Sequence, residues 1–138
     1  MKWNLNGAIE NELVFVSGNP GSTNRAYTAE HFEMIRDVAL PYRLELFSRR
    51  IKNLEDYGKT SPEHLRQAQE DYFNLQNSYK VYAGQDKGFK NPSLNLVGKK
   101  KQKDDALKAV VAKTPKLQQY ASAWDDIAKA EAYSIATF

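Results

Sequence analysis

The chain has 138 residues, of which 41% are hydrophobic and 27% charged, and its formal net charge is +3. This length suffices for one domain with a modest core, and the composition is that of an ordinary soluble protein. The lack of cysteine excludes disulfides, zinc–thiolate sites and cysteine nucleophiles. The small charge does not indicate nucleic acid or a membrane surface as a partner, and no apolar run is long enough to span a bilayer.

The first predicted element is a short β segment at residues 13–16, an apolar and mostly β-branched run. The following Asn19-Pro20-Gly21 sequence predicts a type II turn, with Pro20 and Gly21 at its centre. Glycines before a helix also suggest a phosphate loop, but the Gly-Lys-Ser/Thr ending is missing and Pro20 removes an N–H, so the turn is favoured. Because a lone strand has no partner, we expect the chain to be a piece of a larger protein.

The second element is a long helix, predicted over residues 28–57. Pro41 lies within it, and we expect a kink there rather than a break. The helix carries two apolar seams, so it is expected to contact more than one neighbour. The seams are Leu40, Leu44, Phe47, Ile51 and Leu54, and Phe32, Ile35, Ala39, Tyr42 and Leu46.

A clear stop and restart follows this helix. Gly58 suits the C′ position and Ser61 the N-cap of a second helix over residues 62–83, which Gly84 and Gly88 are expected to end. The second helix has one apolar seam, so the two helices should form an antiparallel hairpin with their seams facing each other. Its seam consists of Leu65, Ala68, Tyr72, Leu75, Tyr79 and Tyr82.

Two further helices are predicted, one capped by Asn91-Pro92 and one restarted by Thr114-Pro115. The lysine-rich run 99–103 could contact phosphates, but Asp104-Asp105 follow it and no aromatics interrupt it, so a solvated helix face is favoured. The predicted fold class is therefore mainly α: a long antiparallel helical hairpin plus two further helices, preceded by a short β segment. The last helix carries Leu117, Tyr120, Trp124 and Ile127.

Candidate chemistry is sparse. Neither His31 nor His64 has a second histidine or a carboxylate at a metal-binding spacing, and no Gly-x-Ser-x-Gly sequence marks a nucleophile. We therefore expect no metal, no cofactor and no complete catalytic set, with both histidines solvated or capping locally. Asn77 lies opposite the seam of the second helix, near Phe73, Lys80 and Val81, where its amide oxygen could accept from a cation or amine. From the residues alone, an ordinary exposed asparagine is favoured.

Three blocks carry a resemblance to a known family. They are ELVFVSGNPGSTNR (residues 12–25), RDVALPYRLELFSRR (36–50) and QEDYFNLQNSYKVYAG (69–84). Together they resemble the bacterial dipeptidyl-peptidases of serine peptidase family forty-six, which includes dipeptidyl-peptidases seven and eleven. The resemblance covers nearly the whole chain. It implies a serine-type dipeptidyl aminopeptidase that releases dipeptides from peptide N-termini and acts in the periplasm or after secretion.

In that family a double β-barrel carries the Ser-His-Asp triad, and an inserted helical domain covers its cleft. The resemblance implies that residues 1–25 are the end of a barrel strand and a crossover loop, and that residues 26–138 are the first part of the cap. No catalytic residue is then expected in this chain, which should be inactive alone. The family binds the substrate's α-amino group with an asparagine in an Asn-x-x-Lys-x-x-x-Gly block, which implies this role for Asn77.

Two other readings remain open from the sequence. The chain could be a stand-alone helical protein-interaction module that binds partners through its exposed seams. The weakest alternative is a nucleic-acid binder using the lysine run. The expected partner is the peptide substrate, without nucleic acid or membrane, and self-association as a homodimer is left open.

Overall fold

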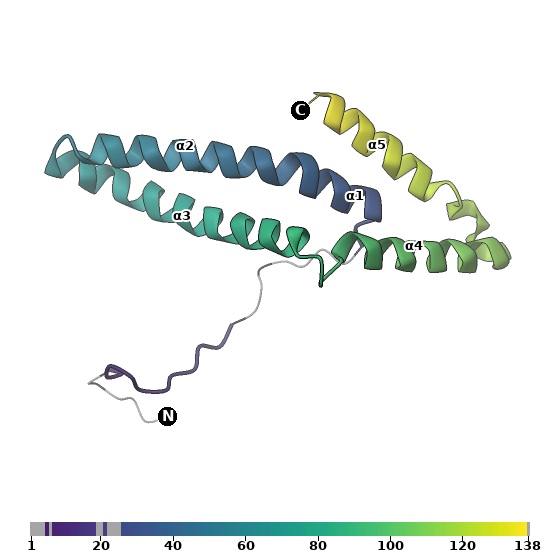
Figure 1. Cartoon of the computed structure of the whole chain (residues 1–138), viewed down its shortest axis with the longest axis horizontal. Coiled ribbons are helices and arrows are strands. Elements are labelled where there is room, and N and C mark those ends of the chain that lie inside the picture. Colours follow the sequence, from purple (N-terminus) through teal and green to yellow (C-terminus); the bar gives the residue numbers. More distant parts are fainter. Residues whose placement is uncertain (1–4, 6, 19–20, 22–25, 138) are drawn as a thin grey trace.

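The computed structural model describes residues 5, 7–18, 21 and 26–137, and within them the chain is built from helices (Figure 1). The prediction of a mainly α fold is confirmed. The elements are α1 (Ala29–Met34), the π-helical segment η1 (Ile35–Ala39), α2 (Leu40–Gly58), α3 (Pro62–Lys90), α4 (Leu96–Lys113), the 3-10 segment η2 (Pro115–Tyr120) and α5 (Ala123–Thr137). None of these helices is long and apolar enough to cross a membrane.

The first predicted helix corresponds to α1, η1 and α2 in succession. It begins where expected, because Thr28 is the N-cap and its hydroxyl accepts a hydrogen bond from the His31 N–H at 3.3 Å. The irregularity expected near Pro41 takes the form of a π turn, in which the Leu40 N–H reaches back to the Ile35 carbonyl. Proline lacks the N–H that would continue the α-helical hydrogen bonds. The π turn directly before Pro41 accommodates this missing hydrogen bond without breaking the helix.

The antiparallel hairpin of α2 and α3 is confirmed, and Figure 1 shows the two helices side by side along most of their length. Ile51 and Ala68 are buried between them. The Phe47 and Tyr82 rings lie 5.5 Å apart, and the Arg43 guanidinium lies 5.1 Å from the Tyr82 ring. The predicted seam that contains Phe47 and Ile51 therefore faces the predicted seam of the second helix, and together they form the core of the hairpin.

The hairpin turn depends on Ser61 and Gly58. The Ser61 hydroxyl caps α3 by accepting from the His64 N–H at 3.1 Å, as predicted. Gly58 is the last residue of α2 rather than a left-handed cap, a role the sequence had suggested, because Lys59 ends the helix with φ −70°. A Cβ on Gly58 would lie 3.2 Å from the Leu65 side chain, so glycine here permits the close approach of α3.

The predicted end of the second helix is wrong, since α3 passes through Gly84 and Gly88 and ends at Lys90. A glycine inside a helix costs about 1 kcal/mol relative to alanine, which packing can outweigh. Phe89 provides this packing, because its ring contacts the Phe32 ring of α1 edge-on, with 5.5 Å between the ring centroids. This contact extends the helix beyond its local stop signals.

The start of α4 also differs from the prediction. Asn91 ends α3 and holds the following turn, because its side-chain oxygen accepts from the Ser93 N–H at 3.0 Å. The N-cap of α4 is Asn95 instead, in the left-handed conformation with φ 42° and ψ 51°. Farther on, the buried Trp124 of α5 lies under Lys108 of α4, with 5.7 Å between the ammonium and the ring.

The β segment expected at residues 13–16 does not form a strand within the described part of the chain. Its side chains are exposed, Phe15 by 89% and Val16 by 94%, and the segment runs apart from the helices (Figure 1). A strand is defined by pairing, and no described segment is available to pair with it. Asn19 and Pro20, the core of the predicted turn, lie outside the described residues.

Candidate functional site

Asn77 lies on the face of α3 that points away from α2, and it is exposed. One turn before it Phe73 is 59% exposed, and one turn after it Val81 is 52% exposed. Residues four positions apart on a helix are neighbours on its surface. Near the end of this stripe, a Cβ added to Gly84 would meet no atom within 4 Å. We call Phe73, Asn77 and Val81 the Asn77 face: one amide between two large exposed apolar side chains.

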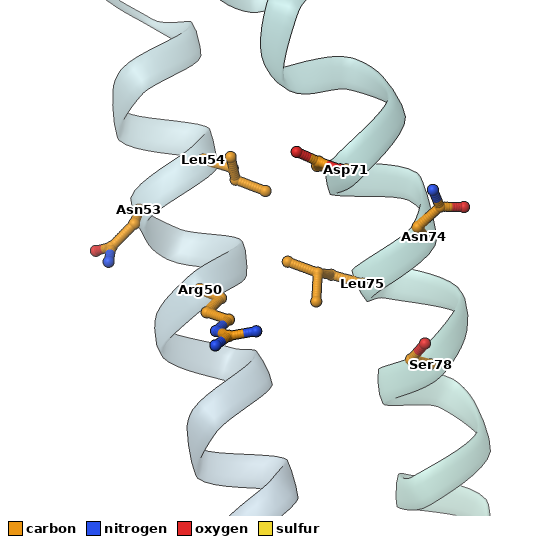
Figure 2. Close-up of a pocket in the computed structure, with 7 residues that line it drawn as sticks. All are labelled: Arg50, Asn53, Leu54, Asp71, Asn74, Leu75 and Ser78. Atoms are coloured by element: carbon orange, nitrogen blue, oxygen red, sulfur yellow. The ribbon is translucent and has the colours of Figure 1, made fainter.

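A groove lies between α2 and α3 (Figure 2). Its volume is about 460 Å³. Figure 2 shows Leu54 and Leu75 pointing toward each other across it, with Arg50 from α2 near one end and Asp71 from α3 near the other. The lining residues are Arg50, Asn53, Leu54, Asp71, Asn74, Leu75 and Ser78.

A buried carboxylate joins α4 to the start of α1. Asp104 is 5% exposed and accepts a hydrogen bond from the Ala29 N–H at 2.7 Å. The Lys100 ammonium lies 2.8 Å from its other oxygen, and the Lys100 side chain is itself only 18% exposed. The expectation of a solvated face for this charged run is therefore wrong at Lys100 and Asp104. The carboxylate supplies an acceptor to the first turn of α1, where the helix dipole favours a negative charge.

His31 is likewise neither solvated nor limited to a local cap. Its Nδ1 contacts the Glu131 carboxylate of α5, and its side chain is 22% exposed. The Tyr27 ring lies on its other side, with 3.9 Å between the ring centroids. His31 thus connects the first turn of α1 to α5, a role that the sequence analysis missed.

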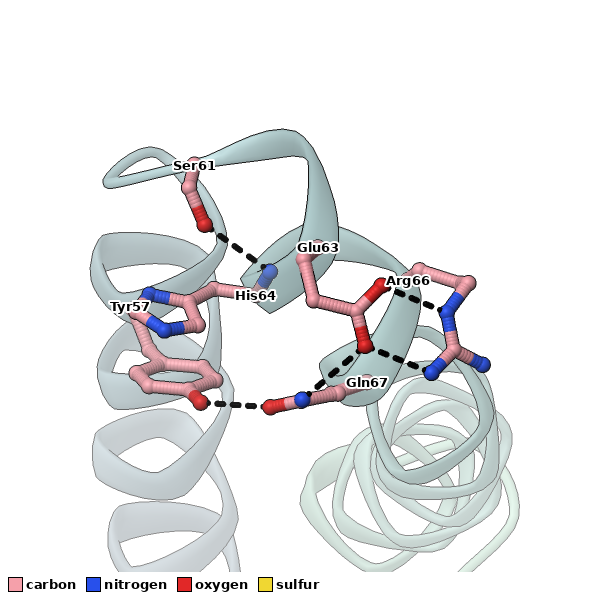
Figure 3. A network of polar contacts seen from close by, with 6 residues as sticks. All are labelled: Tyr57, Ser61, Glu63, His64, Arg66 and Gln67. Atoms are coloured by element: carbon pink, nitrogen blue, oxygen red, sulfur yellow. Dashed lines mark hydrogen bonds and ion pairs between the residues drawn. The ribbon is translucent and has the colours of Figure 1, made fainter.

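The hairpin tip carries a third polar cluster, and it is local as predicted for His64 (Figure 3). The His64 ring stacks on Tyr57 with 4.3 Å between centroids, and the Tyr57 hydroxyl donates to Gln67 at 2.7 Å. Arg66 donates to both oxygens of Glu63, at 2.8 and 2.6 Å. These hydrogen bonds hold the pKa of the Glu63 carboxyl below its usual value.

Comparison with known proteins identifies the family. The sequence model described as Peptidase S46 matches residues 1–137. The chain belongs to this peptidase family. The predicted resemblance is thereby confirmed at the level of the family, and membership implies a peptide hydrolase, with dipeptidyl aminopeptidase activity general to the family. No curated protein and no solved structure matches the chain.

The surroundings of the two histidines bear on whether either could act as a catalytic base. His31 is held by a carboxylate, but no serine or threonine hydroxyl among the described residues is hydrogen-bonded to its ring. His64 contacts the Thr60 hydroxyl at 2.6 Å, yet that hydroxyl donates to the Tyr57 carbonyl and so closes the turn. Among the same residues, no group of three or more metal-ligating side chains could hold a metal ion.

Proposed function

We propose that this chain is the helical cap of a serine-type dipeptidyl aminopeptidase, in which Asn77 binds the free α-amino group of the substrate. The observation that carries the proposal is the Asn77 face. An amide oxygen accepts hydrogen bonds from an ammonium group. Phe73 and Val81, exposed on either side, would exclude water around that contact once the cap closes on a neighbouring surface, and the exclusion of water strengthens it.

The α2–α3 hairpin could fix the distance that a dipeptidyl-peptidase needs along its substrate. An enzyme that releases dipeptides must fix the distance between the substrate N-terminus and the bond it cleaves. The 29 residues of α3 span about 43 Å, and α2 supports the helix along one side. An acceptor on such a stiff support positions the substrate, and positioning contributes to catalysis by lowering the entropy lost on the way to the transition state.

The N-terminal segment fits the same proposal. In the parent enzyme, residues 1–25 would complete a barrel sheet and lead into the cap formed by residues 26–138. The exposed residues Leu13, Val14, Phe15 and Val16 would then pair with a strand outside this chain. The triad would lie in that barrel, the isolated chain would be inactive, and the enzyme would act in the periplasm or outside the cell. The family match over residues 1–137 favours this reading over a stand-alone interaction module.

The test is the Asn77→Ala variant of the full-length enzyme, assayed with a dipeptide reporter that has a free N-terminus. A hydrogen bond to a charged group contributes about 1.5–3 kcal/mol, so kcat/KM should fall roughly 10- to 150-fold. The matched control is Gln85→Ala, which removes another exposed amide from the same helix and should leave kcat/KM unchanged. If Asn77→Ala also retains full kcat/KM, Asn77 does not bind the amine.

A further inference from the structure

The groove between α2 and α3 contains opposite charges whose side chains have no partner among the residues that the structure describes. Within the described residues, neither the Arg50 nor the Asp71 side chain makes a hydrogen bond or an ion pair. Other basic residues of the hairpin do pair with a carboxylate three or four positions away on their own helix. These pairs are Arg49 with Glu45, Lys59 with Asp56 and Arg66 with Glu63.

The sequence explains why the groove charges stay unpaired. The positions one helical turn from Arg50 hold leucine, phenylalanine, asparagine and leucine, and none of these is acidic. Those one turn from Asp71 hold glutamine, alanine, asparagine and leucine, and none of these is basic. Pairs at these spacings are the ones that a helix surface allows. Both charges are therefore directed to partners outside their own helix.

We propose that this groove binds a short peptide of two or three residues with free termini, Arg50 taking its carboxylate and Asp71 its ammonium group. Figure 2 shows the two charges toward opposite ends of the groove, with Leu54 and Leu75 between them and Ser78 at the Arg50 end. The apolar middle would contact the peptide side chains. A volume of about 460 Å³ lies in the range of small-molecule sites, roughly 300–1,000 Å³.

The length of the groove along α3 limits the length of the ligand. Asp71 and Ser78 are seven positions apart on α3, which corresponds to about 10 Å along a helix. An extended residue spans about 3.3–3.6 Å, so a groove about 10 Å long accommodates a peptide of at most about three residues. A phosphate would be repelled by Asp71, and a metal cation by Arg50. The two opposite charges of the groove therefore select a ligand that carries both a positive and a negative group.

This site is separate from the Asn77 face. Asn77 does not line the groove, although Asn74 and Ser78 on the same helix do. The inference rests on the groove alone and stands whether or not Asn77 binds a substrate amine. Dipeptides released by an aminopeptidase belong to the ligand class that the groove selects.

The test is a titration of the purified chain with glycyl-leucine, followed by NMR signals of the Leu54 and Leu75 methyl groups. We expect saturable shifts at these methyls, and much weaker ones with N-acetyl-glycyl-leucine or glycyl-leucinamide, which each lack one terminal charge. Arg50→Gln and Asp71→Asn should each weaken binding roughly two- to fivefold, as expected for exposed charge pairs. Arg49→Gln is the matched control, because Arg49 directly precedes Arg50 in the sequence but does not line the groove. This variant should leave the affinity unchanged.

The charge-exchanged variant Arg50→Asp/Asp71→Arg keeps the net charge and should restore binding with the peptide reversed. Circular dichroism reports whether each variant keeps its helices. The proposal is overturned if glycyl-leucine gives no saturable shift, if the blocked peptides bind equally well, if Arg49→Gln weakens binding as much as Arg50→Gln, or if inorganic phosphate binds as tightly as the peptide. A saturable glycyl-leucine titration together with an unchanged kcat/KM in Asn77→Ala would reject the amine-binding role of Asn77 and leave the groove proposal standing.

Discussion

Asp104 is the buried carboxylate whose removal should destabilise the chain most. In an Asp104→Ala variant, the Ala29 N–H loses its acceptor, and Lys100, whose side chain is 18% exposed, loses its counter-charge. Breaking a buried ion pair by removing one partner costs about 3–5 kcal/mol, because the remaining charge is left uncompensated. Small domains have unfolding free energies of about 5–15 kcal/mol, so the loss would be a large fraction of the total.

The measurement is urea unfolding followed by circular dichroism, with amide hydrogen exchange to locate the loss at the start of α1. Asp105→Ala is the matched control, since Asp105 is the exposed neighbour of Asp104, and it should change the unfolding free energy by less than about 0.5 kcal/mol. Adding Lys100→Met to Asp104→Ala should recover part of the loss, because it removes the unpaired charge. A loss below about 1 kcal/mol, or no recovery in the double variant, would refute the account of Asp104 as a buried ion-pair partner.

Three further predictions concern other caps and pairs. His31→Ala should release α5 and leave the buried Glu131 carboxylate without its partner, so amide exchange in α5 should speed up while exchange in the hairpin stays the same. Asn95→Ala should lower the unfolding free energy by about 1 kcal/mol and Asn95→Gly should not, because asparagine tolerates the left-handed conformation through its short polar side chain, alanine does not, and glycine has no Cβ to clash; equal losses in both variants would contradict this. Because Arg66 lowers the pKa of Glu63, ionised Glu63 stabilises the hairpin tip fully above its ordinary value of 4.5 and progressively less as the pH falls through the lowered pKa. Amide protection at the tip should therefore fall in acid, and Glu63→Gln should flatten that dependence.

The hairpin could be predicted because its signals are local. Ser61 and Thr28 precede their helices by one residue, and each caps an N–H three positions later. The facing seams repeat every three or four residues, so helix geometry alone places Ile51 of α2 and Ala68 of α3 on the buried faces of their helices. The same geometry gave the face on which Asn77 lies. Its role in binding an amine comes from the family resemblance and stays a prediction.

The missed contacts join residues that are far apart in the sequence. Asp104 meets Ala29 across 75 positions, and His31 meets Glu131 across 100. A charged residue on a helix looks the same in the sequence whether it is solvated or buried against another helix. The helix end predicted at Gly84 was wrong for a related reason. The local stop signal of this glycine is weaker than the packing of Phe89 farther along α3.

These distant contacts bear on the position of the Asn77 face. In Figure 1, α4 and α5 lie around α1, and the hairpin extends away from them. The contacts of Asp104 and His31 fix α1 at its first turn, and the π turn η1 carries that orientation into α2. Under the proposed role of Asn77, its amide would meet a substrate amine at a fixed place, and this requires a support with one orientation. The polar contacts of Asp104 and His31 at α1 would therefore help to orient the exposed Asn77 face, although they lie at the opposite end of the first helix from the hairpin tip.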